Sequence, residues 1–123
     1  MILLAIACLT EYLKTAPHTG ETGRFQMPKY LVLLNLTDQG AKTVKEIPNK
    51  RDQSRETAKK FGVERKQAWM TFGPYDFVHL YEAPNDDAMA KFVLKFSSFG
   101  SVRTTVMRAW DESEHLPLVQ DLP

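Results

Sequence analysis

The amino-acid sequence predicts one α+β domain, and three observations carry this prediction. The chain has 123 residues, which is the length of a single domain. Hydrophobic residues make up 43% and charged residues 25%, as in ordinary globular proteins. Short β-compatible segments alternate with segments whose apolar residues recur at helical spacing. The formal net charge of +1 provides no general attraction to nucleic acid or to an anionic membrane, so neither is an expected partner.

The first half of the domain is predicted to contain a strand and a broken helix. The strand is expected at residues 30–36, which read Tyr-Leu-Val-Leu-Leu-Asn-Leu. Thr37 can cap a helix that begins directly after it. Pro48 breaks this helix or restarts it in its first turn. A charged helix is then expected over residues 49–60, and Gly62 provides the positive φ that often ends a helix.

A β-hairpin is the strongest local prediction. Residues 63–72 and 75–83 are expected to be antiparallel strands, and the Gly-Pro pair at 73–74 is expected to be their turn. Residues 84–100 are predicted to form the second helix, with acidic residues at its start and a wide apolar face. The last strand is expected at 102–110. The order strand, helix, strand, strand, helix, strand is that of a ferredoxin-like βαββαβ fold, with a four-stranded antiparallel sheet and both helices on one face.

Alternation of side chains along the strands assigns residues to the two faces of the sheet. The helix side is predicted to hold Val32, Leu34, Leu36, Ala68, Met70, Phe72, Val78, Leu80, Val102 and Val106. The opposite face is predicted to hold Leu31, Leu33, Asn35, Gln67, Trp69, Thr71, Tyr75, Phe77, His79, Tyr81, Arg103, Thr105 and Met107. This second face is too apolar to remain in water. We expect a second copy of the same sheet to cover it, which makes the chain a homodimer or higher oligomer.

Four segments resemble the GYD domain family. They are residues 30–40 (YLVLLNLTDQG), 73–76 (GPYD), 82–86 (EAPND) and 102–109 (VRTTVMRA). The family consists of small bacterial and archaeal proteins, is named for its Gly-x-Tyr-Asp motif, and is similar to the dimeric α/β-barrel superfamily. The resemblance covers residues 27–110. It implies the fold and self-association, and it implies no particular activity, because the family has no generally established one.

The Gly-Pro-Tyr-Asp turn has a structural and a functional interpretation. Gly73 permits a positive φ, Pro74 fixes its own φ, and Asp76 can accept backbone N–H groups across the turn. As a functional site, Tyr75 and Asp76 would handle protons, but alternation along a strand points them to opposite faces. The structural interpretation is the one we adopt. Leu36 stands where many family members carry Trp, a departure that concerns packing.

Five residues are candidates for a small-ligand pocket on the inner sheet face: Asn35, Trp69, His79, Tyr81 and Arg103. Aromatic walls with an imidazole and a guanidinium suit a small anionic or aromatic molecule. Alternatively, His79 is an interface histidine bonded to a backbone carbonyl or to the partner subunit. Arg103 suits a ligand carboxylate and a carboxylate across the dimer equally well.

No catalytic signature, cofactor motif or metal-ligand spacing is found in the sequence, so no cofactor and no metal are expected. The leading function is a homo-oligomeric, non-catalytic module with a small-ligand pocket. The alternative is a cofactor-free oxidoreductase or isomerase acting on an aromatic or lactone-type molecule, which rests on fold analogy alone.

The two ends of the chain are predicted to lie outside the domain. Residues 1–26 are expected to be an N-terminal extension, disordered or a start-site artefact, since Met27 directly precedes the first strand; a lipoprotein signal ending at Cys8 is the alternative. Residues 111–123 are expected to be a polar tail. The single cysteine and the absence of an apolar run of bilayer length favour a cytoplasmic protein.

Overall fold

The computed structural model describes residues 27–123, so the expectations for residues 1–26 lie outside the described residues. Residues 27–109 form one compact unit, and residues 110–123 belong to a second one. The elements are β1 (Lys29–Leu36), α2 (Asp38–Lys42), the 3-10 turn η2 (Val44–Glu46), α3 (Ile47–Lys60), β2 (Glu64–Met70), β3 (Phe77–Glu82), α4 (Asp86–Ser97), β4 (Val102–Ala109) and α5 (Glu112–Gln120).

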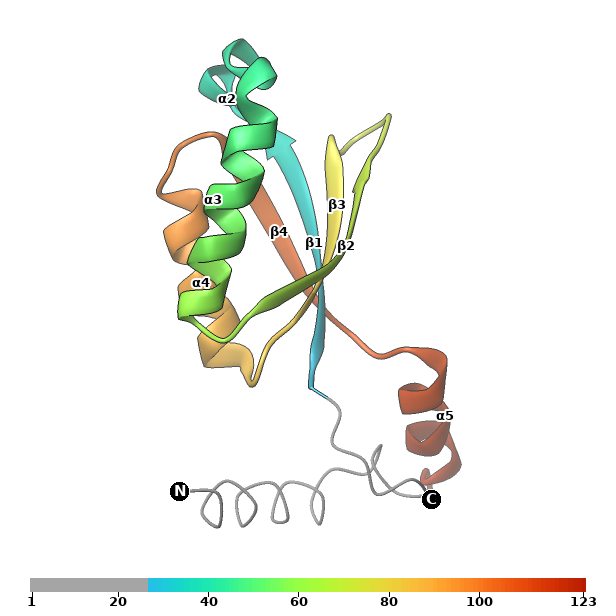
Figure 1. Cartoon of the computed structure of the whole chain (residues 1–123). Helices are drawn as coiled ribbons and strands as arrows, with labels where there is room; N and C mark the ends of the chain where they lie inside the picture. Colours follow the sequence, from blue (N-terminus) through green and yellow to red (C-terminus); the bar gives the residue numbers. More distant parts are fainter. Residues whose placement is uncertain (1–26) are drawn as a thin grey trace, which may run out of the picture. The chain divides into compact units, whose positions relative to one another are not determined.

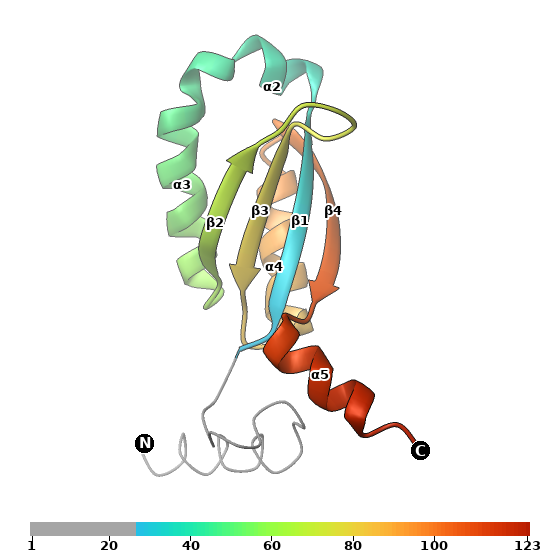
Figure 2. The same cartoon turned by 90° about the vertical axis from the view of Figure 1, so that its right-hand side faces the viewer.

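The four strands form one antiparallel sheet with the order β2-β3-β1-β4. Helices α3 and α4 lie on the same face of this sheet (Figure 1). Figure 2 presents the opposite face, which no helix of residues 27–109 covers. The predicted ferredoxin-like architecture is therefore confirmed, and the sheet has one face packed on helices and one open face.

Local sequence signals explain where the helices begin and end. The Thr37 hydroxyl accepts the Gly40 N–H at 3.1 Å and caps α2, and the Asn85 side chain accepts the Ala88 N–H at 2.8 Å and caps α4. Pro48 occupies the first turn of α3, where a missing N–H costs nothing, so the chain restarts its helix there. Gly62, with φ of 73°, lies just after the end of α3.

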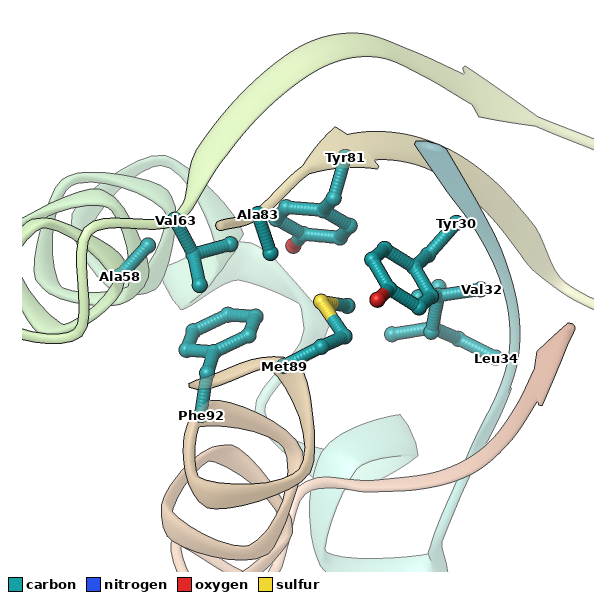
Figure 3. Close-up of a cluster of buried hydrophobic side chains, with 9 residues drawn as sticks. All are labelled: Tyr30, Val32, Leu34, Ala58, Val63, Tyr81, Ala83, Met89 and Phe92. Carbon is teal, nitrogen blue, oxygen red and sulfur yellow. The ribbon is translucent and has the colours of Figure 1, made fainter. Parts of the chain in front are cut away.

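The hydrophobic core lies between the sheet and the two helices (Figure 3). From the sheet side it receives Tyr30, Val32, Leu34, Tyr81 and Ala83, and the helices and the α3–β2 connection contribute Ala58, Val63, Met89 and Phe92. The rings of Tyr81 and Phe92 are 5.1 Å apart, and Phe92 stacks on Phe96 at 5.5 Å. This aromatic column joins the centre of the sheet to α4.

The predicted faces of β3 were wrong. The register pairs Val32 with His79 and Tyr30 with Tyr81, and directly opposed residues share a face. His79 and Tyr81 therefore lie on the helix side, and Val78 and Leu80 lie on the open face. The physical reason is that both faces of β3 carry large apolar side chains. Alternation alone then leaves the orientation undecided, and the pairing with β1 decides it.

Residues 111–123, predicted as a polar tail, contain helix α5. The Asp111 side chain accepts the Glu114 N–H at 3.1 Å, and the Glu114 side chain accepts the Asp111 N–H at 2.9 Å. This reciprocal arrangement is a capping box. The Asp-x-x-Glu spacing is visible in the sequence and was the signal for this helix. Pro117 obscured it, because a proline inside a helical segment normally predicts a break.

Candidate functional site

The structure distributes the five predicted pocket residues over both faces of the sheet. Asn35 and Arg103 are opposed residues of β1 and β4 on the open face, and Trp69 lies on the same face on β2. His79 and Tyr81 are buried on the helix side. One ligand cannot contact all five side chains, because the sheet separates Asn35 and Arg103 from His79 and Tyr81. Trp69 lies on the edge strand β2 and lines one cavity together with His79.

The open face is apolar at its centre. Leu31 is opposed to Leu80 and Leu33 to Val78, so these four side chains form a block on the two central strands. Trp69 flanks the block from β2 and is 47% exposed, and Met107 flanks it from β4 and is 43% exposed. We call these six residues the open-face patch: Leu31, Leu33, Trp69, Val78, Leu80 and Met107. The polar residues around this patch include Asn35, Gln67, Arg103 and Thr105.

A polar cluster lies on the helix side of the sheet. The His79 Nδ1 and the Tyr81 hydroxyl are 3.2 Å apart, and Arg65 on β2 is paired with Tyr81. Burial, and secondly the Arg65 charge, lower the pKa of His79 to about 4, so its imidazole is neutral at pH 7. Burial raises the pKa of Tyr81 to about 12, although Arg65 opposes that shift. The cluster is therefore one cation beside two neutral hydrogen-bonding groups.

Arg65 was missed by the sequence analysis because of a β-bulge. By strict alternation Arg65 shares the face of Gln67 and Trp69. The register shifts between Arg65 and Gln67, and this places Arg65 opposite Tyr81 on the helix side. The sequence carries no clear signal for the bulge, so only the structure identifies Arg65 as a neighbour of His79.

The Gly-Pro-Tyr-Asp turn connects the hairpin to β1. Gly73 adopts a φ of 124°, which a side chain would strain. The Asp76 carboxylate accepts the Leu36 N–H at 2.8 Å, and the Asp76 N–H donates to the Leu34 carbonyl oxygen at 2.8 Å. Asp76 thus extends the pairing with β1 by one residue before Phe77, the first residue of β3. The Tyr75 carbonyl accepts the Thr71 hydroxyl at 2.6 Å, which holds the hairpin end.

Replacing Asp76 with Ala is expected to lower the free energy of unfolding by about 1–2 kcal/mol, since the partly buried Leu36 N–H loses its acceptor. Urea denaturation followed by circular dichroism measures this change. Asp52→Ala is the matched control, because the Asp52 side chain is 72% exposed on α3 and its removal is expected to cost less than about 0.5 kcal/mol. Equal stabilities of the two variants would contradict the anchoring role of Asp76.

Residues 27–123 contain no group of three or more His, Cys, Asp or Glu side chains arranged to hold a metal ion. None of their helices combines the length and the hydropathy needed to span a bilayer.

Comparison with known proteins identifies the family. The GYD domain model matches residues 30–119. The glutamine synthetase and cystathionine beta-lyase binding protein of Thermus thermophilus is 37% identical over 84 residues, which are 68% of this chain and 88% of the Thermus protein.

Two solved structures are similar at low identity. MtbAldR has a TM-score of 0.54 at 13% identity, over 69% of this chain and 53% of its own, so the chain spans about half its length. The feast or famine regulatory protein of M. tuberculosis, solved with L-methionine, has a TM-score of 0.47 at 12% identity, over 90% of this chain and 73% of its own. The first of these supports the fold. The family match, which covers most of the chain, and the Thermus relative show that this chain belongs to the GYD domain family.

Proposed function

We propose that this protein is a homo-oligomeric, non-catalytic binding module whose copies associate through the open-face patch. The patch itself is the observation that carries the proposal. Six large apolar side chains are contiguous over four strands, and no helix of residues 27–109 covers them. An apolar surface of this extent on a small domain marks an interaction site.

A second copy is the occupant that suits this face best. The patch spans the centre of a sheet, and two such sheets can pack face to face about a two-fold axis at a spacing of about 10 Å. Its polar neighbours, Asn35 and Arg103, lie together on β1 and β4, as expected for a polar rim around an apolar centre. The resemblance to the dimeric α/β-barrel superfamily supports the same arrangement.

Leu80→Arg tests self-association, since a guanidinium at the centre of the patch cannot be desolvated without a partner. We expect native mass spectrometry and light scattering to detect a dimer or higher oligomer of the unmodified chain. The variant is expected to dissociate at least about 100-fold more readily, a loss of about 2.7 kcal/mol. Leu94→Arg is the control: Leu94 lies on α4 and is 73% exposed, so that variant keeps the parent assembly. A monomeric parent chain at high concentration, or an unchanged Leu80→Arg assembly, would refute the proposal.

The name of the Thermus relative favours a second binding activity, in which the module associates with a metabolic enzyme. Two apolar side chains near the hairpin turn are available for such a contact outside the open-face patch. Met70 is 75% exposed and Phe72 is 101% exposed. Titration with glutamine synthetase and with cystathionine β-lyase from the same cell tests this activity. We expect Phe72→Ser to weaken binding without changing the assembly of the module, and no binding to either enzyme would exclude it.

A further inference from the structure

A cavity of about 460 Å³ lies between α3, the helix side of the sheet and the C-terminal end of α4. Its size is within the range of roughly 300–1,000 Å³ that small-molecule sites occupy. Much of its wall is apolar and comes from β1, β3, the end of α4, the α4–β4 connection and the start of β4. The apolar residues of this wall include Leu34, Leu36, Phe77, Phe96, Phe99 and Val102. The cavity is therefore suited to the apolar body of a ligand.

The charged side chains that line the cavity are all cationic. They are Lys50 and Arg51 of α3 and Arg65 of β2, and no Asp or Glu is among the lining residues. Lys50 Nζ donates to the hydroxyls of Thr43 and Ser101, which are neutral partners. In the described part of the chain neither Lys50 nor Arg65 forms a salt bridge. Arg51 is paired with the Asp52 carboxylate at 3.5 Å, so Lys50 and Arg65 are the cations that give the cavity a positive potential.

Arg65 and His79 place two kinds of hydrogen-bonding group on the same wall. The bulge in β2 directs Arg65 to the side of the sheet where His79 is buried, 9% exposed, against the Tyr81 hydroxyl. A guanidinium presents paired N–H donors that match the two oxygens of a carboxylate. A neutral imidazole next to it adds a polar group without adding charge.

We propose that this cavity binds a small monocarboxylate with an apolar body, whose carboxylate is held by Arg65 beside His79 and whose apolar part packs against Leu34, Phe77 and Phe96. Lys50 contributes positive potential from the other wall. The Arg65 guanidinium can hold one carboxylate in paired geometry, and the apolar side chains around it favour a ligand whose remaining part is uncharged. Trp69 lines both the cavity and the open-face patch, and the other five patch residues lie on the opposite side of the sheet from Arg65 and His79. The carboxylate site therefore stands independently of the proposed function.

Calorimetric titration of the full-length chain with decanoate, decanol and acetate at pH 7.5 tests this proposal. Decanoate and decanol share the apolar body, and acetate has only the carboxylate. We expect saturable binding of one decanoate per chain, at least tenfold weaker binding of decanol, and no measurable binding of acetate. Arg65→Gln is expected to weaken decanoate binding at least tenfold and to leave decanol unchanged.

Three further variants show where the probe binds. Ala68→Phe fills the cavity from β2 and is expected to weaken both decanoate and decanol. Lys59→Gln removes a cation that is 74% exposed on α3 and is expected to leave the titrations unchanged. Leu80→Arg alters the open-face patch and is also expected to leave them unchanged. The proposal is overturned if decanoate and decanol bind with equal affinity. It is also overturned if Arg65→Gln binds decanoate as tightly as the parent chain, or if Leu80→Arg is the only variant that loses decanoate binding. Thermal unfolding of each variant verifies that it is folded.

Discussion

Replacing Phe92 with Ala is expected to lower the free energy of unfolding by about 3–5 kcal/mol, as for other buried aromatic side chains. Phe92 is 0% exposed and lies between the rings of Tyr81 and Phe96. Its removal leaves a cavity between α4 and β3, and the surrounding side chains relax only partly into such a space. Urea denaturation at 25 °C measures the loss as a lower midpoint with an unchanged slope.

Leu94→Ala is the matched control for this prediction. It lies on the same helix and its side chain is 73% exposed, so the change in stability is expected to be within about 0.5 kcal/mol. All variants must be compared at one protein concentration, because association stabilises the folded state. A loss below about 1 kcal/mol for Phe92→Ala would show that the α4–sheet interface is not the main core of the domain.

Acidification is expected to destabilise the folded chain through His79. Its pKa is lowered from 6.5 to about 4 in the folded protein, first by burial and second by the Arg65 charge. Between these two pH values the unfolded chain binds the proton that the folded chain does not. Stability therefore falls as the pH drops from about 6.5 to about 4, by up to about 3 kcal/mol, and this contribution changes no further below pH 4.

Comparison with His79→Gln isolates this effect from the titration of carboxylates, which both proteins share. The free energy of unfolding of the parent chain minus that of the variant is expected to decrease by up to about 3 kcal/mol between pH 7 and pH 4. His115→Gln, at an exposed position of α5, is the control for the substitution itself and is expected to change the free energy of unfolding by less than about 0.5 kcal/mol. A pH-independent difference for His79→Gln would show that His79 takes up its proton in the folded chain as readily as in the unfolded one.

The orientation of β3 changes how the candidate site is understood. With His79 and Tyr81 on the helix side, the open face has a simpler, aliphatic centre, which suits packing against another sheet. The ionisable neighbours of His79 then lie in a separate environment under α3. Self-association and ligand binding thus use opposite faces of one sheet, and variants such as Leu80→Arg and Arg65→Gln can separate them.

Much of the fold is predictable from local sequence signals. Thr37 and Asn85 are capping residues whose side-chain bonds form within one helical turn, and Gly62 ends α3 with a positive φ. The Gly73-Pro74 pair marks the hairpin turn in the same way. Each of these signals acts between residues close in the chain, so the sequence alone determined the order of the elements from β1 to β4 and, with it, the architecture.

The composition of the two faces depended on contacts between distant residues. Both faces of β3 are apolar, so its orientation followed from pairing with β1, where Val32 is opposed to His79. The bulge before Gln67 reversed the alternation in β2 and moved Arg65 beneath α3. A strand carries the same period of two in either orientation. Only hydrogen bonding between strands decides which alternate side chains of a strand face the helices. For that reason the tertiary structure alone decided which side chains form the patch and which line the cavity.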